Sequence, residues 1–167
     1  MIHFLVKGEH MISATELFNI LGANGIDVGR TQVNVADSTF ACPTKEYITY
    51  EFATFFRNKC LEMGLGTWEN TNDCDNFAYQ YYVMAQWAHY ATKKSMAEGL
   101  AVGVMYFMSG ARAEDGSGGG HAINLAIVGK PGQHELIFLE PQFAGVRRSC
   151  EIPLSYFEKE SIWFINF

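Results

Sequence analysis

Long apolar runs and targeting signals are missing from this chain. Its longest apolar run, residues 100–108, is too short to span a bilayer. The first ten residues lack both the cationic start and the apolar length of a signal peptide. We therefore expect a cytoplasmic protein, either of a bacterium or of a phage-infected host cell.

Positive charge is also scarce. Twelve lysines and arginines face 18 aspartates and glutamates, so the formal net charge is −6. This balance argues against nucleic acid or an anionic membrane as the main partner. The oligomeric state stays open.

The four cysteines, Cys42, Cys60, Cys74 and Cys150, have no closely spaced pair. We read them as free thiols in a reducing compartment. A zinc site needs three or four convergent ligands, and the histidines and cysteines show no such spacing. We expect no metal and no cofactor.

The order of elements predicts the fold class. The 167 residues suffice for a single domain, 1–167, with helices first and strands afterwards. This order indicates an α+β fold with an antiparallel sheet packed against a central helix that carries Cys74 at its N-terminus. Residues 1–64 form an N-terminal layer of strand and helix, and residues 65–145 form the core. Three helices are expected: one that starts with the capping box Ser13–Glu16, and two that cover 45–63 and 74–94. The expected strands are 2–6, 100–108, 121–128, 135–140 and 161–167.

Cys74 begins the apolar stripe of the third helix. Thr71, Asn72 and Asp73 are all good N-caps, so the helix starts beside Cys74. Free backbone N–H groups and the helix dipole favour a thiolate there, whereas Asp73 and Asp75 oppose one. Cys74 is also compatible with a plain core position.

A hairpin brings a histidine and a carboxylate together. The strands on either side of residues 129–134 have two possible registers, which place His121 opposite Glu140 or opposite Gln142. Cysteine, histidine and acid supply a nucleophile, a proton carrier and a group that orients the imidazole. Gln142 is the alternative third member. The backbone N–H of Cys74 with a side chain from Trp68, Asn70 or Asn72 is the candidate oxyanion site.

Three short motifs carry a family resemblance. Residues 73–78, Asp-Cys-Asp-Asn-Phe-Ala, resemble the Asp-Cys-acid-x-aromatic-Ala motif of bacterial transglutaminase-like cysteine proteinases. Residues 120–125, Gly-His-Ala-Ile-Asn-Leu, resemble a strand of the wider transglutaminase-like and papain-like group, and residues 138–142 resemble a segment of papain-fold toxins and deamidases. The resemblance covers 65–145 and implies a papain-like core with nucleophile Cys74, base His121 and orienting acid Glu140.

The resemblance implies a thiol protease-like enzyme. Such an enzyme would be a cysteine-dependent amide hydrolase or acyl transferase, namely a peptidase, an isopeptidase or a glutamine deamidase, and would act through a thioester on a protein or peptide substrate. Two alternatives remain open. One is an inactive interaction module with the same fold, such as a phage or bacterial accessory protein, and the other is a peptidoglycan peptide hydrolase.

Overall fold

The computed structural model describes residues 10–66, 72–93, 98–109 and 119–167. The expected strand at 2–6 and most of the glycine-rich segment before His121 lie outside these ranges.

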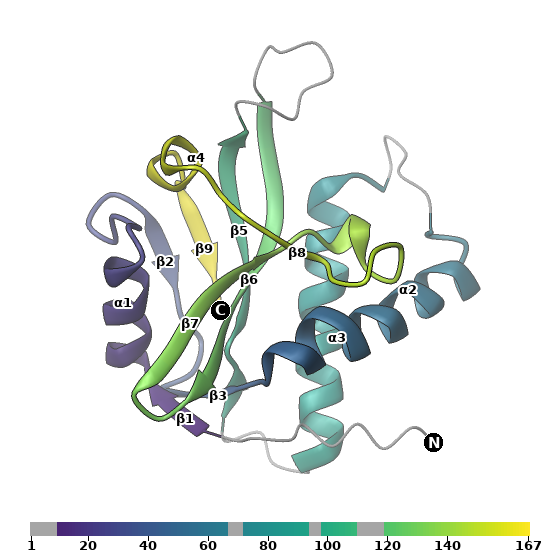
Figure 1. The fold of residues 1–167 in the computed structure, drawn as a ribbon, viewed down its shortest axis with the longest axis horizontal. Helices are drawn as coiled ribbons and strands as arrows, with labels where there is room; N and C mark the ends of the chain where they lie inside the picture. The colour runs from purple at the N-terminus through teal and green to yellow at the C-terminus, as the bar shows by residue number, and fades with distance from the viewer. Residues whose placement is uncertain (1–9, 67–71, 94–97, 110–118) are drawn as a thin grey trace.

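A six-stranded sheet forms the middle of the molecule (Figure 1). Two long antiparallel ladders make up its centre: β5 (Val102–Ser109) pairs with β6 (Gly119–Lys130), and β6 pairs with β7 (Gln133–Leu139). The glycine at position 129 has a φ of 117°, a value that favours glycine, just before the tight β6–β7 turn. In order across the sheet the strands are β2 (Gln32–Asn34), β9 (Phe164–Asn166), β5 (Val102–Ser109), β6 (Gly119–Lys130), β7 (Gln133–Leu139) and β8 (Glu151–Ile152).

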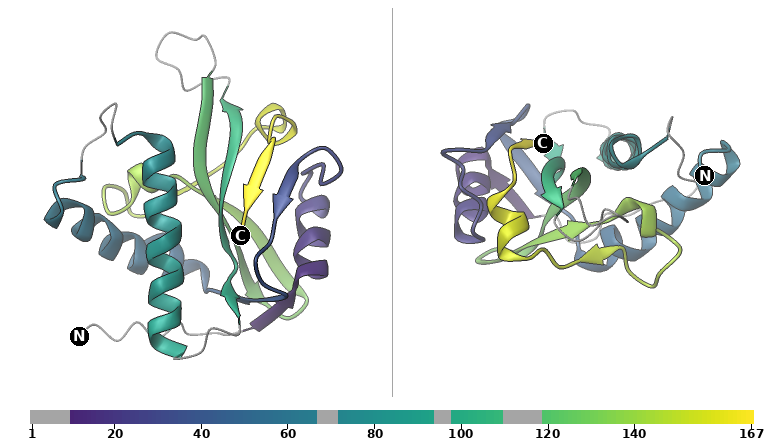
Figure 2. Two further views of the ribbon diagram at one scale, coloured as in Figure 1. Left: turned by 180° about the vertical axis from the view of Figure 1, so that it is seen from behind. Right: turned by 90° about the horizontal axis from the view of Figure 1, so that it is seen from above.

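Helices cover both faces of this sheet, as the end-on view in Figure 2 shows. On one face lies α1 (Ala14–Ala23), which starts with the expected capping box of Ser13 and Glu16. The other face carries α3 (Cys74–Lys93), together with the π-helical turn η1 (Tyr47–Glu51) and α2 (Phe52–Glu62), which continues it. A short helix, α4 (Tyr156–Glu160), precedes β9.

A small second sheet joins the N-terminal layer to the rest. It contains β1 (His10–Ser13), β3 (Thr39–Cys42) and β4 (Gly99–Leu100), in the order β1-β3-β4. The first pair is antiparallel and the second is parallel. A two-residue strand such as β4 is too short to leave a periodic signal in the sequence.

The expected fold class is therefore wrong in its architecture. A sheet, not a helix, occupies the centre, and α3 covers only one face of it. The main sheet is mixed, because β2 and β9 run parallel. The sequence hid this pairing because the two strands are three residues long and lie far apart in the chain.

Each face of the sheet has its own apolar core. Alternation along the central strands sends Val102 and Ala126 toward α2 and α3, and Met105 and Leu125 toward α1. Within the described ranges no helix is long and apolar enough to cross a membrane.

Candidate functional site

Cys74 is the first residue of α3, as the N-cap residues before it predict. The side-chain oxygen of Asn76 accepts a hydrogen bond of 3.4 Å from the backbone N–H of Asp73, which fixes the chain entering the helix. Cys74 is partly buried and packs against the small cluster of Ala78 and Ala122. Its sulfur thus lies where the head of α3 meets β6.

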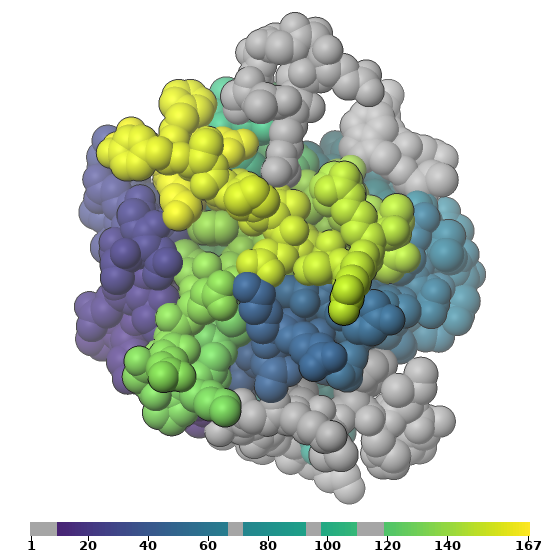
Figure 3. Space-filling model, in the orientation of Figure 1, coloured from purple at the N-terminus to yellow at the C-terminus, as the bar shows by residue number. Residues whose placement is uncertain are grey.

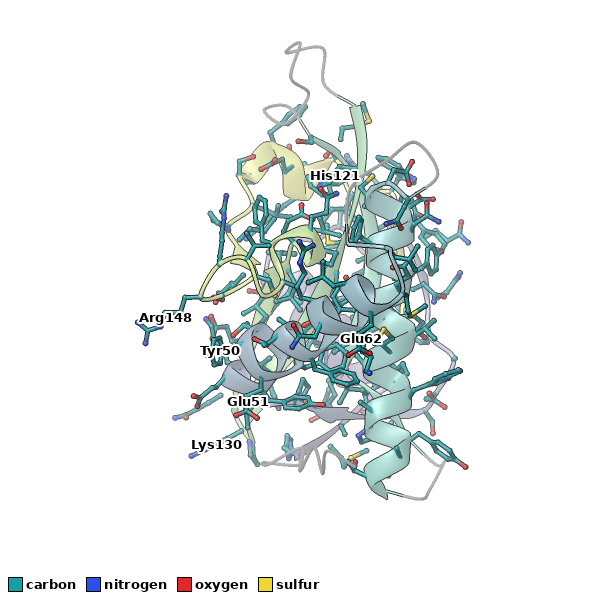
Figure 4. The ribbon with its side chains drawn as sticks, turned by 90° about the vertical axis from the view of Figure 1, so that its right-hand side faces the viewer. Tyr50, Glu51, Glu62, His121, Lys130 and Arg148 are labelled. Atoms are coloured by element: carbon teal, nitrogen blue, oxygen red, sulfur yellow. The ribbon has the colours of Figure 1, made fainter. Side chains whose placement is uncertain are left out.

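His121 and Glu140 meet beside this helix end. His121 Nε2 lies 2.8 Å from Glu140 Oε2. Asn124 pairs with Leu139, which is the second of the two registers expected for the hairpin. Glu140 directly follows β7, and its side chain turns to the histidine and also accepts a 3.3 Å hydrogen bond from the backbone N–H of Gln142. Figure 4 shows His121 next to the upper, N-terminal end of α3.

The surroundings favour a protonated His121. Burial lowers the pKa of its imidazole, but hydrogen bonds to Cys74 and Glu140 and the negative charges of both groups raise it to about 9. The two side chains of the His121–Glu140 pair are only 15% and 4% exposed, so water screens the pair weakly. At neutral pH an imidazolium therefore stands between the Glu140 carboxylate and the Cys74 sulfur.

The other three cysteines lie in different environments. Burial raises the pKa of Cys42 and Cys150 to about 12 and that of Cys60 to about 11. These thiols are buried and protonated at neutral pH. Cys74 is the one cysteine of the chain that combines partial exposure with a histidine partner.

Asn124 ties the two halves of the site together. Its Nδ2 donates to the backbone oxygens of Ala78, at 2.9 Å, and Gly103, at 3.0 Å. Ala78 lies one helical turn after Cys74, and Asn124 lies three residues after His121. These hydrogen bonds fix the start of α3 against β6. Phe107 adds an edge-on contact with the His121 ring, at 5.6 Å between centroids.

The oxyanion candidates are placed only in part. Trp68 and Asn70 lie outside the described residues. Asn72 is buried, its Nδ2 donates to the Leu65 carbonyl at 2.9 Å, and its Oδ1 accepts from Gln80 at 3.1 Å. Its amide therefore braces the approach to α3. Gln142, the alternative partner of His121, contributes its backbone N–H to Glu140, while the Glu140 side chain reaches the histidine.

Sequence reasoning missed an aromatic border of the site. Tyr106 on β5 packs against the same small cluster as Cys74, and its ring lies 6.5 Å from Tyr79 and 6.1 Å from Trp163. Burial, a hydrogen bond with Tyr79 and the charges of Asp75 and Cys74 all raise the pKa of Tyr106. The alternating pattern of β5 could have indicated that Tyr106 faces α3, but not that Trp163 follows it.

The segment after Glu140 packs against η1 and α2. The short 3-10 turn η2 (Pro141–Phe143) follows, and Arg147 lies over the Phe143 ring at 3.6 Å. Figure 3 shows this yellow-green segment lying against the blue atoms of η1 and α2. Among the described residues no group of three or more histidine, cysteine, aspartate or glutamate side chains is placed to hold a metal ion.

Comparison with known proteins gave one family and several structures. A family model described as Agglutinin C-terminal matches residues 48–145. No curated protein matched. The structure of PSL1a in complex with E64 is 17% identical with a TM-score of 0.66, covering 94% of this chain and 51% of that chain. Polyporus squamosus lectin bound to a human-type influenza-binding epitope, Neu5Aca2-6Galb1-4GlcNAc, is 18% identical with a TM-score of 0.63, covering 94% and 49%.

These findings correct the expectations that rested on the resemblance. At such identities the structures share the fold, and the chain spans about half the length of each. The fold is shared with PSL1a and with Polyporus squamosus lectin, and it is not the expected papain-like core around a central helix. The predicted cysteine-dependent amide hydrolase or acyl transferase of the thiol protease type was therefore wrong. The two alternatives, an inactive papain-like interaction module and a peptidoglycan peptide hydrolase, were wrong too, and so was the expected protein or peptide substrate. The matches are to an agglutinin family and to a lectin.

The short motifs explain the error. An acid-cysteine pair at a helix start and a glycine-histidine strand are each only a few residues long, so they recur in more than one family. The family model instead matches a continuous stretch, residues 48–145, that holds Cys74, His121 and Glu140 and makes up more than half of the 167 residues. The chain belongs to the Agglutinin C-terminal family.

Proposed function

We propose that this chain is a domain of a lectin-like, carbohydrate-binding agglutinin, and that Cys74, His121 and Glu140 form its chemical site. In this site Cys74 is a thiolate that binds an electrophilic ligand covalently. The family match and the lectin neighbours support the first part of the proposal. One observation carries the second part: the buried Glu140 holds His121 at 2.8 Å, and Cys74 acts on the same imidazole, so that both groups raise its pKa.

Each residue has a distinct role in the proposed site. Glu140 holds the imidazole of His121 through Nε2, and Cys74 lies close enough to the same ring to raise its pKa. The imidazolium stabilises the thiolate by charge and by a hydrogen bond. When the sulfur attacks an electrophile, an anion forms on the ligand, and His121 donates its proton to that anion.

The epoxide E64 tests this site directly, and a structural neighbour was solved in complex with it. The Cys74 sulfur would open the epoxide: a carbon–sulfur bond forms, a carbon–oxygen bond breaks, and His121 protonates the resulting alkoxide. We expect intact-mass analysis to show one adduct per chain, and peptide analysis to place it on Cys74. Cys74→Ser should abolish the adduct, and His121→Ala should slow its formation by about tenfold or more.

A matched control comes from the buried thiols. Cys60→Ser removes a cysteine whose thiol is buried and whose pKa is about 11, so E64 labelling should stay at the wild-type rate. Labelling spread over all four cysteines, or an equal rate in His121→Ala, would rule out the proposed site.

Carbohydrate binding by this chain itself is the second candidate, favoured by the glycan complex of a neighbour with the same fold. The test is a glycan array probed with the wild-type chain and with Cys74→Ser. Equal binding of both to defined glycans would support a carbohydrate site separate from the thiol. If the wild-type chain binds no glycan, carbohydrate binding by this chain itself is refuted.

A further inference from the structure

Beside Cys74 three aromatic rings contact one another in sequence, and the two outer rings are exposed. Tyr106 is the middle ring, with Tyr79 of α3 on one side and Trp163, just before β9, on the other. Tyr79 and Trp163 are 38% and 43% exposed. Position 120, next to His121, is a glycine, and a Cβ there would come within 3.4 Å of the Trp163 ring. The row thus borders the thiol site directly.

Negative charge lies at one end of this row. The charges of Asp75 and Cys74 both act on the Tyr106 hydroxyl. The neighbouring Asp73 carboxyl, together with burial, raises the pKa of Asp75. In the described part of the chain no lysine or arginine forms an ion pair with either aspartate, and Asp73 Oδ1 is buried there without a hydrogen-bond partner.

Aromatic faces next to unneutralised carboxylates attract cations. The face of a tryptophan or tyrosine ring carries negative potential, and the attraction grows where water is partly excluded. We propose that Tyr79, Tyr106, Trp163 and Asp75 form a subsite that binds the ammonium or guanidinium group of the ligand that reaches Cys74. This inference rests on the proposed function, because it assigns part of the same ligand.

Charged thiol reagents can measure the subsite. Methanethiosulfonates react by attack of the Cys74 thiolate on the sulfenyl sulfur: a disulfide forms, and methanesulfinate leaves with the electron pair. A trimethylammonium-ethyl reagent, a neutral methyl reagent and a sulfonatoethyl reagent differ in charge. After normalisation to the rates with a small free thiol, we expect the cationic reagent to modify Cys74 about tenfold faster than the neutral one. The anionic reagent should be the slowest.

Variants separate the aromatic and the electrostatic parts. Trp163→Leu and Asp75→Asn should each reduce the preference for the cation several-fold. Trp87→Leu is the matched control, because Trp87 also lies on the surface, 72% exposed and farther along α3, and it should leave the preference unchanged. Equal normalised rates for the three reagents would overturn the subsite, as would a preference that Trp163→Leu leaves intact.

A binding measurement keeps this inference apart from the reactivity of the thiol. In Cys74→Ser, tetramethylammonium should shift the NMR signal of the Trp163 indole N–H, and neutral tert-butanol should not. If this shift is seen in Cys74→Ser but Cys74 of the wild type does not react with E64, the proposed function is refuted and the cation site is retained. The absence of a shift would refute the cation site, whatever the thiol does.

Discussion

The raised pKa of His121 predicts that the protein loses stability in alkaline solution. The imidazole has an ordinary pKa of 6.5 and one of about 9 in the folded chain. A raised pKa means that the folded state holds the proton more tightly than the unfolded state does. The resulting stabilisation is complete below pH 6.5 and is lost as the pH rises through about 9. The difference corresponds to about 3 kcal/mol of unfolding free energy.

Urea unfolding followed by circular dichroism measures this loss. The unfolding free energy of the wild type should fall by about 3 kcal/mol between pH 6.5 and pH 9. In Glu140→Gln the fall should shrink to roughly half, because Cys74 still supports the imidazolium. In His121→Phe this contribution should disappear.

A second histidine provides the control. The ring of His134 stacks on His10, 5.0 Å between centroids, in another part of the fold. His134→Gln leaves Glu140 and Cys74 beside His121, so the part of the fall that depends on His121 should remain. If wild type, Glu140→Gln and His121→Phe lose the same free energy over this range, the coupling of His121 to Glu140 and Cys74 is refuted.

Three further substitutions test how the site is held in place. In Gly129→Ala the new methyl would collide with the Gln133 carbonyl at a positive φ, so thermal unfolding should show a loss of about 2 kcal/mol or more. Asn124→Ala leaves two buried carbonyls without their donor; we expect a loss of about 2 kcal/mol and slower E64 labelling, and wild-type labelling would contradict its positioning role. Tyr81→Phe removes the buried hydrogen bond to the Ile48 carbonyl and should cost about 1 kcal/mol in urea unfolding, with labelling unchanged.

Local chemistry in the sequence predicted the elements that carry the site. The capping box at Ser13, the helix start at Cys74 and the turn after Gly129 depend on neighbouring residues, and the structure confirms all three. The hairpin arithmetic also anticipated that Glu140 lies near His121, because both residues lie just beyond the same end of one ladder, which closes with Asn124 opposite Leu139.

Pairings between distant segments could not be predicted. The parallel pairs β2–β9 and β3–β4 join strands of two to four residues that no turn connects. The same limit hid Trp163 from the site, since it reaches Tyr106 only through the pairing of β9 with β5. The family prediction was wrong for a related reason. It rested on short motifs of about six residues each, whereas the family model matches a continuous stretch of about a hundred residues.

The position of β9 constrains the order in which this chain can fold. The last strand of the sequence lies between β2, near its beginning, and β5. On the ribosome β2 must therefore wait for residues made more than a hundred positions later before it is paired. Closing so large a loop is entropically slow, so we expect the sheet around β5, β6 and β7 to form first and β2 to join last.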